Sequence, residues 1–449
     1  MSRPRQFVQP PLEFIPPDLN MSILRGMRSI LPFWMRHRTA ISRIEAIQVE
    51  KLVDLYEQFQ SGKIRLLIAF RHPSSDDPFC LMYLMHYLLP RTARRQGIRL
   101  RLPTHSHFMY DRGIPLWAGS RVGWIYSKLG GTPIHRGKLD RVGLRSARDL
   151  LANGQFPLMA APEGATNGHN EIVSPLEPGI AQMGFWCVED LQKANRNEEV
   201  IIVPIGIQYH YVKRDWTPVD QLLGELETDT GITPKNPDRY ARLYTIAEHM
   251  LTVMESFYKK FYHQDLPSVE HAEPNARLAL RLQVLMDSAL TVAEQYFDIQ
   301  PKGSVIDRCR RLEQAAWDLI FREDLKLGEL SPVDRGLADR VAEEASLRIW
   351  HMRLVESFVA VTGRYVIEKP SLDRFAETTL LLWDMITRIK GGDAFKRPKL
   401  GKQSVLITVG DPISVSDRAA ATKGDRRATK QAVADLTQDL QTAMEKMIL

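Results

Sequence analysis

The 449-residue chain has few cysteines and no long hydrophobic run. Its three cysteines, Cys80, Cys187 and Cys309, lie far apart and form no CxxC pair, so we expect reduced, buried thiols rather than a disulfide framework. Stretches without Asp, Glu, Lys or Arg, such as 78–90 and 200–212, reach 13 residues, whereas a membrane span needs about 20. We therefore expect no transmembrane helix.

The first residues also lack the apolar core of a secretory signal and contain Arg3, Arg5 and several prolines instead. This absence predicts a cytoplasmic protein. Hydrophobic residues make up 44% of the chain and charged residues 25%, a balance that excludes a disordered or collagen-like protein. At about 150 residues per domain, the length predicts two or three domains, or one domain with an insertion.

Positive charge is concentrated in two segments. Residues 21–43 contain five arginines and no acid, interleaved with apolar and aromatic residues, a mixture that suits the interface between water and lipid. Residues 91–138 contain ten Lys or Arg and one acid, Asp111, an excess larger than the net charge of +6 of the whole chain. We expect this region to contact phosphate head groups, an acidic carrier protein or nucleic acid; a solvated charged face is the alternative.

The spacing of apolar residues changes along the chain. Apolar runs of strand length at 63–70, 156–161 and 200–207 alternate with helical segments, which predicts an α/β domain. Residues 213–400 instead carry apolar side chains at three- and four-residue spacing, as amphipathic helices do. Residues 405–409 form one more strand, which we expect to return to the first sheet because a strand needs partners.

These patterns predict a fold of the α/β class: a mixed twisted sheet flanked by helices, with a large all-helical insertion before the last strand. The expected parts are a basic amphipathic N-terminal segment at 1–44, an α/β core at 45–212, a helical insertion at 213–400, and the final strand of the core with a C-terminal helix at 401–449.

His72 and Asp77 lie where the first apolar strand ends and a helix begins, with Pro78 in its first turn. Sites in open α/β sheets form at the carboxyl ends of strands. A histidine there can act as a general base if a carboxylate holds its other ring nitrogen. Residues five apart on a regular helix point about 140° away from each other, so this contact requires a non-helical bend. Asp76 is the competing partner, and the alternative is that Ser74, Asp76 or Asp77 merely caps the helix.

Three further motifs follow along the chain: GGTPIHR at 130–136, APEGATN at 161–167 and the apolar VIIVPI at 200–205. Together with the His72-x4-Asp77 spacing, their order and content resemble the glycerolipid acyltransferase family, which includes glycerol-3-phosphate and 1-acylglycerol-3-phosphate acyltransferases. The resemblance extends over residues 45–211 and the strand and turn at 405–413.

The resemblance implies that His72 is the general base and Asp77 its orienting carboxylate. It also implies that five residues bind substrate: Arg136 as a phosphate clamp, Gly131, Glu163, Gly164 and Thr166. The chain departs from the family in having Arg71 before the histidine, where Asn is frequent, and in lacking the Thr-Arg pair that often follows the P-E-G motif. The helical insertion is not part of the family's common core.

The activity implied by the resemblance is transfer of a fatty acyl group from a thioester to a hydroxyl of glycerol 3-phosphate or 1-acylglycerol 3-phosphate in phospholipid synthesis. The alcohol must lose a proton as it attacks the thioester carbonyl, and this needs no covalent enzyme intermediate. We expect no metal or cofactor beyond the co-substrate, acyl-CoA or acyl carrier protein. The expected partners are that donor, the glycerol phosphate acceptor and the phospholipid surface on the cytoplasmic face of a membrane.

Other interpretations have weaker support. His105-x-His107 with Asp111 suggests a metal hydrolase, but the further ligands of such a site do not cluster with them. A serine hydrolase would need a G-x-S-x-G motif, and none is present. No nucleic-acid-binding motif accompanies the basic region, so nucleic acid is not an expected partner. The main alternative is a catalytically inactive, membrane-associated scaffold that retains the acyltransferase shell.

Overall fold

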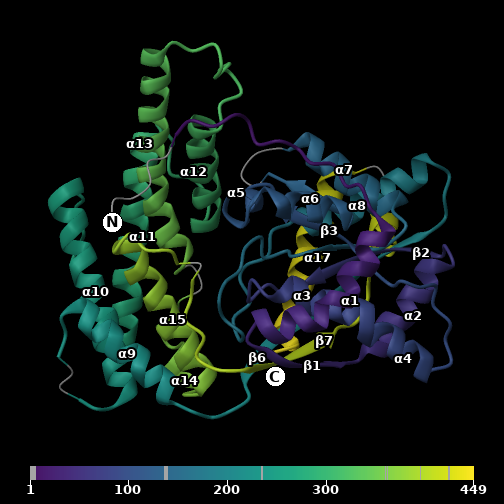
Figure 1. The fold of residues 1–449 in the computed structure, drawn as a ribbon, viewed down its shortest axis with the longest axis horizontal. Helices are drawn as coiled ribbons and strands as arrows, with labels where there is room; N and C mark the ends of the chain where they lie inside the picture. Colours follow the sequence, from purple (N-terminus) through teal and green to yellow (C-terminus); the bar gives the residue numbers. More distant parts are fainter. Residues whose placement is uncertain are drawn as a thin grey trace. The chain divides into compact units, whose positions relative to one another are not determined.

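The computed structural model describes residues 7–135, 140–233, 236–358, 361, 363–394, 396–422 and 425–448. The chain forms two compact units (Figure 1). The α/β unit contains the described residues of 13–135, 140–213 and 401–448. The helical unit contains residues 7–12 and the described residues of 214–400.

One sheet forms the centre of the α/β unit. Its eight described strands are β1 (Ile41–Ile47), β2 (Ile64–Phe70), β3 (His107–Asp111), β4 (Gly131–Ile134), β5 (Leu158–Ala160), β6 (Glu199–Tyr211), β7 (Gln403–Val409) and β8 (Ile413–Ser414). Their order is β1-β7-β6-β2-β5-β3-β4, and β8 pairs with β6. Neighbouring strands run parallel except where β6 meets β7 and β8.

Strand β6 joins the parallel and antiparallel parts of the sheet. Its first half pairs with β2, and its second half, from Ile205 to Tyr211, pairs with β7. The predicted strand at 200–207 is therefore too short by four residues at its end, because β7 supplies hydrogen-bond partners for residues 208–211. This extension brings Tyr209 into the sheet.

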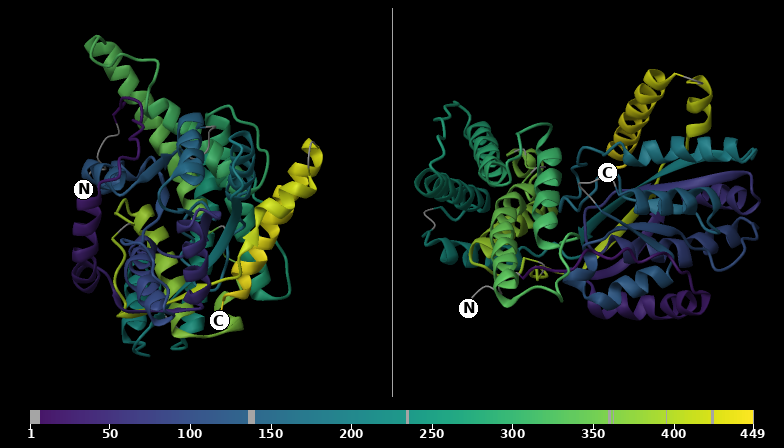
Figure 2. Two further views of the ribbon diagram at one scale, coloured as in Figure 1. Left: turned by 90° about the vertical axis from the view of Figure 1, so that its right-hand side faces the viewer. Right: turned by 90° about the horizontal axis from the view of Figure 1, so that it is seen from above.

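Helices cover both faces of the sheet. On one face lie α1 (Met21–Arg38), α2 (Val49–Gln60), α3 (Asp77–Tyr83), a π-helical turn (Leu84–Leu88) and α4 (Leu89–Arg95). On the other lie α7 (Arg141–Asn153), α8 (Gly179–Lys193), α16 (Val415–Ala421) and α17 (Arg426–Lys446). The right-hand view of Figure 2 shows purple α1 and yellow α17 on opposite sides of the sheet. The short helices α5 (Ile114–Ala118) and α6 (Ser120–Lys128) lie between β3 and β4 in the chain.

Burial on both faces explains why β2 is apolar at every position except Arg65, which is buried and donates to the carbonyls of Leu151 and Gly154. Leu66 and Ile68 pack into the core on the α2 side, whereas Leu67 and Ala69 pack into the core on the α8 side. A strand that is covered on both faces does not alternate polar with apolar positions. All seven residues of β2 are buried.

The helices of the helical unit lie between β6 and β7 in the sequence. Its helices are α9 (Thr217–Thr230), α10 (Arg239–Tyr262), α11 (Pro274–Tyr296), α12 (Val305–Ile320), α13 (Pro332–Glu356), α14 (Tyr365–Glu368) and α15 (Leu372–Ile389). Its core includes Tyr258, Leu290, Leu312 and Met352. The predicted fold class, a mixed α/β sheet flanked by helices with a helical stretch before β7, is confirmed. The three cysteines are buried and unpaired, as predicted.

The N-terminal segment 7–12 packs on the helical unit. The Val8 side chain is buried in a cluster with Ala316, Ala342 and other small side chains of α12 and α13. The backbone of Gln9 donates to the Ile320 carbonyl at 2.7 Å and accepts from the Arg322 amide at 3.0 Å. These contacts hold the segment at the end of α12.

Two buried histidines stack in the α/β unit. The rings of His86, in the π-helical turn, and His105, just before β3, are 5.2 Å apart and nearly parallel. The two residues are 1% and 3% exposed. Burial lowers the pKa of His86 to about 4 and the pKa of His105 to about 3, from an ordinary value of 6.5. Both rings are therefore neutral in the folded protein at pH 7.

We predict that His86 makes the α/β unit sensitive to acid. Unfolding returns its pKa to the ordinary value, so the unfolded chain binds more protons between about pH 6.5 and pH 4. Above about pH 6.5 protonation of His86 does not change the free energy of unfolding. As the pH decreases from 6.5 toward 4, this free energy falls. At pH 5 the loss of unfolding free energy from one such histidine is about 2 kcal/mol. His86→Leu removes it, so the free energy of unfolding in urea should decrease less between pH 7.5 and pH 5 than in the wild type.

The control for this prediction is His37→Gln, which changes an exposed histidine of the same unit. It should lose as much stability on acidification as the wild type. An equal loss in His86→Leu and His37→Gln would contradict the prediction.

Candidate active site

The structure brings His72 and Asp77 into direct contact. His72 follows the last residues of β2, and Asp77 is the first residue of α3. The Nδ1 atom of His72 lies 2.8 Å from Oδ2 of Asp77. The non-helical bend that this contact requires is present, since residues 71–76 precede the helix. Asp76, the N-terminal capping residue of α3, makes no side-chain capping bond, whereas the Ser74 hydroxyl accepts the Asp76 N–H at 3.2 Å.

The Asp77 carboxylate is held by three donors, two from the bend after β2 and one from β6. Its side chain is completely buried. Besides the His72 ring, Oδ2 accepts the backbone N–H of Ser74 at 2.9 Å, and Oδ1 accepts the hydroxyl of Tyr209 at 2.5 Å. A carboxylate with both oxygens engaged in this way keeps one orientation.

The His72 ring is fixed along one edge and accessible elsewhere. It packs edge-on against Phe70, with 5.7 Å between the ring centres, and 23% of its side chain is exposed. When Nδ1 donates its proton to Asp77, Nε2 has a lone pair that can accept a proton. This arrangement can perform general-base chemistry on a hydroxyl group.

Glu163 holds the backbone of His72. Its side chain is completely buried, and Oε1 accepts the His72 N–H at 2.8 Å. Oε2 accepts the side-chain amide of Asn167 and the backbone N–H of Ser174, both at 3.0 Å. These contacts tie the loop after β5 to the end of β2. Glu163 thus positions His72 in this structure, whatever its part in binding an acceptor.

Arg71 also holds the loop after β5, through the backbone carbonyls of that loop. The residue is buried, and its guanidinium donates to the carbonyls of Asn170 at 2.5 Å, Ile172 at 2.6 Å and His169 at 3.2 Å. Its Nε lies 3.8 Å from Oε1 of Glu163, so the two buried charges compensate each other. Arg71 therefore anchors the loop after β5.

The remaining predicted substrate residues are distributed as follows. Gly164 and Thr166 belong to the loop after β5, which contacts His72 through the Asn167 N–H and the His72 carbonyl, 3.4 Å apart. Gly164 has a φ of 70°, a value that favours glycine, and Thr166 is exposed. Arg136, the predicted phosphate clamp, lies outside the described residues.

Gly131 does not lie at the end of the sheet where His72 lies. It is the first residue of β4, whereas His72 follows the last residue of β2, so in this parallel part of the sheet they belong to opposite strand ends. A Cβ atom at Gly131 would lie 2.6 Å from the Phe108 ring. Close packing against β3 therefore accounts for this glycine.

Sequence analysis missed Tyr209, Asn170 and Ser174. Tyr209 is 132 residues from Asp77, and no local motif marks it. The alternation of Ile205, Ile207 and Tyr209 on one side of the strand was a signal that could have extended the predicted strand to this residue.

The histidines considered for a metal site serve the fold. His105 Nε2 lies 2.9 Å from the Leu129 carbonyl, and His107 Nδ1 lies 3.0 Å from the Gly130 carbonyl. Both rings are buried, which lowers the pKa of each. Across the described part of the chain, no group of three or more His, Cys, Asp or Glu side chains is arranged to hold a metal ion.

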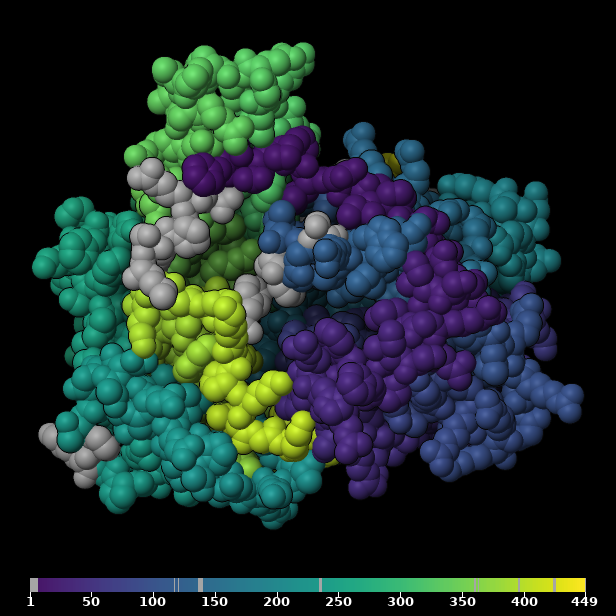
Figure 3. Space-filling view, viewed as in Figure 1, coloured from purple at the N-terminus to yellow at the C-terminus, as the bar shows by residue number. Residues whose placement is uncertain are grey.

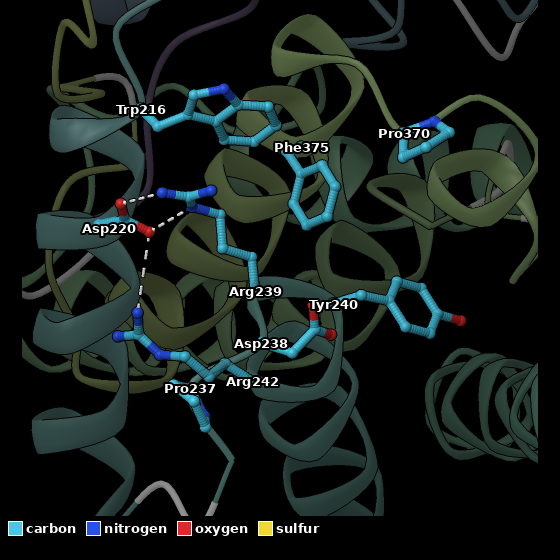
Figure 4. Close-up of a pocket in the computed structure, with 9 residues that line it drawn as sticks. All are labelled: Trp216, Asp220, Pro237, Asp238, Arg239, Tyr240, Arg242, Pro370 and Phe375. Carbon is cyan, nitrogen blue, oxygen red and sulfur yellow. Dashed lines mark hydrogen bonds and ion pairs between the residues drawn. The ribbon is translucent and has the colours of Figure 1, made fainter.

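A cavity of about 530 Å³ lies within the helical unit (Figure 4). Its wall includes Trp216, Asp220, Arg239, Arg242 and Phe375. Arg239 makes two hydrogen bonds to Asp220 and lies over the Trp216 ring, and Arg242 makes two to Glu227. The charges in this wall compensate one another, and the lining residues all belong to the helical unit.

Comparisons with protein-family models, curated proteins and solved structures found no match. The chemistry of the site is therefore inferred from its own geometry and motifs.

We predict that Glu163 contributes to stability through its buried bonds. Glu163→Gln places an amide nitrogen where a carboxylate oxygen accepts N–H groups, so one buried donor meets another. The free energy of unfolding should fall by about 1–3 kcal/mol. Glu57→Gln, at an exposed position of α2, is the control and should change stability by less than about 0.5 kcal/mol. Equal stabilities of the two variants in urea unfolding would show that the Glu163 contacts contribute nothing.

Proposed function

We propose that the protein is an O-acyltransferase that transfers a fatty acyl group from acyl-CoA or acyl carrier protein to a hydroxyl of glycerol 3-phosphate or 1-acylglycerol 3-phosphate. The observation that carries the proposal is the 2.8 Å contact between His72 and a buried Asp77 at the end of a central strand. The P-E-G loop contacts the same histidine through Glu163, which supports a single site built from separate motifs.

The proposed reaction needs one proton transfer in each direction. The acceptor hydroxyl gives its proton to Nε2 of His72 as its oxygen attacks the thioester carbonyl carbon, and Asp77 stabilises the resulting imidazolium. The tetrahedral intermediate then collapses, the carbon–sulfur bond breaks, and the imidazolium proton passes to the leaving thiolate. The enzyme returns to its starting state with an ester and a free thiol as products.

The surface next to this site supports a membrane partner. On α1, the side chains of Ile30, Phe33 and Trp34 are exposed among arginines, with no acidic residue in the helix. The purple atoms of this helix lie at the surface in Figure 3. Trp34 contacts Phe79 of α3, the helix that begins with Asp77, at 6.4 Å between ring centres.

More positive charge follows on α4 and after it. Exposed arginines are Arg91, Arg94, Arg95, Arg99 and Arg101. Within the described chain, no helix is long and apolar enough to cross a bilayer. We propose peripheral binding to anionic lipid on the cytoplasmic face of a membrane, where the acceptor and product reside.

His72→Ala is expected to reduce acyl transfer by about 1,000-fold, because the base is lost, and Asp77→Asn by about 10- to 100-fold. The assay measures free thiol released from acyl-CoA or acyl carrier protein with a panel of hydroxyl acceptors, including glycerol 3-phosphate. His271→Ala, at an exposed position of the helical unit, should retain full activity. Thiol release by His72→Ala at the wild-type rate would refute the mechanism. If the wild type releases none with any acceptor, the inactive scaffold becomes the better explanation.

Phe33→Ser is expected to weaken binding to vesicles that contain anionic lipid by about 10- to 150-fold, since burial of one phenylalanine contributes about 1.5–3 kcal/mol. Binding should also fall with added salt. The control is Phe261→Ser, another exposed phenylalanine, in the helical unit. Vesicle co-sedimentation measures both variants, and equal binding by the two would argue against α1 as the contact.

A further inference from the structure

The hydroxyl of Tyr209 lies in the interior of the α/β unit, between Asp77 and Cys80. It donates to Oδ1 of Asp77 at 2.5 Å, and the Cys80 sulfur is 3.4 Å away. Tyr209 is buried, and burial raises its pKa well above the usual value, so the hydroxyl keeps its proton. The proton of a phenol can be given to one acceptor at a time, and here it goes to the carboxylate.

The backbone of Tyr209 is fixed from two sides. The Asn170 side chain accepts the Tyr209 N–H at 2.8 Å and donates to its carbonyl at 2.7 Å. Across the sheet, Tyr209 faces Val405 in the antiparallel pairing of β6 with β7. The Arg71 guanidinium donates to the Asn170 carbonyl, so the segment that holds Tyr209 is tied to the residue before His72.

We propose that Tyr209 is a positioning residue for the His72–Asp77 pair. Its hydroxyl holds the carboxylate in the orientation that points Oδ2 at the His72 ring, and it takes part of the negative charge of that carboxylate. The inference rests on the proposed function in treating His72 as the base, but the contact itself does not depend on the substrate.

When Tyr209→Phe removes the hydroxyl, the Asp77 charge loses a hydrogen-bond donor and interacts more strongly with a protonated His72. The imidazolium is then favoured, and the pH at which His72 becomes neutral rises. Looser positioning of the ring also lowers the rate of acyl transfer without changing the substrate contacts.

The test measures the neutral fraction of His72 directly. Diethyl pyrocarbonate modifies neutral imidazole, and peptide mass spectrometry reports the modification of His72 in the full-length chain as a function of pH. In Tyr209→Phe the midpoint should rise. The acyl-transfer kcat should fall by about 5- to 50-fold, with KM within about twofold of the wild type. In an Asp77→Asn background, Tyr209→Phe should shift the midpoint no further.

The matched control is Tyr56→Phe. Tyr56 is another buried tyrosine of the α/β unit, and its hydroxyl donates to the His105 carbonyl at 2.9 Å. This variant also loses a buried hydroxyl, so it should lose stability while the His72 midpoint stays unchanged. Asn170→Ala keeps the Tyr209 hydroxyl but releases its backbone, and it should shift the midpoint in the same direction by a smaller amount.

An unchanged midpoint in folded Tyr209→Phe overturns the inference, as does a shift that persists in the Asp77→Asn background. If Tyr209→Phe does not fold, an unchanged midpoint in folded Asn170→Ala overturns it. If the midpoint shifts as stated but no acyl transfer is detected in the wild type, the positioning role stands and the proposed function fails.

Discussion

His72 is held by two completely buried carboxylates, and several surrounding segments supply the hydrogen-bond donors that these carboxylates need. Asp77 holds the ring and Glu163 holds the backbone N–H. A buried carboxylate is costly unless donors surround it. Those donors come from the bend after β2, from the loop after β5 and from the second half of β6. The demand for donors therefore joins three segments that are distant in the sequence.

The sheet makes this convergence possible. β2 and β5 are parallel neighbours, so the segments that follow them leave the sheet at the same edge. β6 runs parallel to β2 and then continues beyond it, and β7 pairs with this extension. Because β6 continues, Tyr209 can reach the first turn of α3. The helices α9 to α15 connect β6 to β7 in the chain. The two strands pair with each other although these helices separate them in the sequence.

The buried charges also explain the arginine that precedes His72. Arg71 neutralises Glu163 and binds three carbonyls of the loop that follows it. Asn167, in the loop that follows the P-E-G motif, donates its side-chain amide to Glu163.

Local sequence patterns were sufficient for the fold class and for naming Asp77 as one of two candidate partners of His72. The apolar run of β2, the helical spacing of residues 213–400 and the strand at 405–409 are properties of short segments, and burial follows directly from them. The contact of His72 with Asp77 spans five residues, so a bend at one strand end is enough to form it.

The roles of Arg71, Asn170 and Tyr209, and the contacts of Glu163, were decided by tertiary structure alone. Glu163 meets the His72 amide across 91 residues, and Tyr209 meets Asp77 across 132. No pattern within one segment specifies which distant donor will satisfy a buried carboxylate. That choice depends on strand order and register, which arise when the whole sheet assembles and its buried polar groups must all find partners.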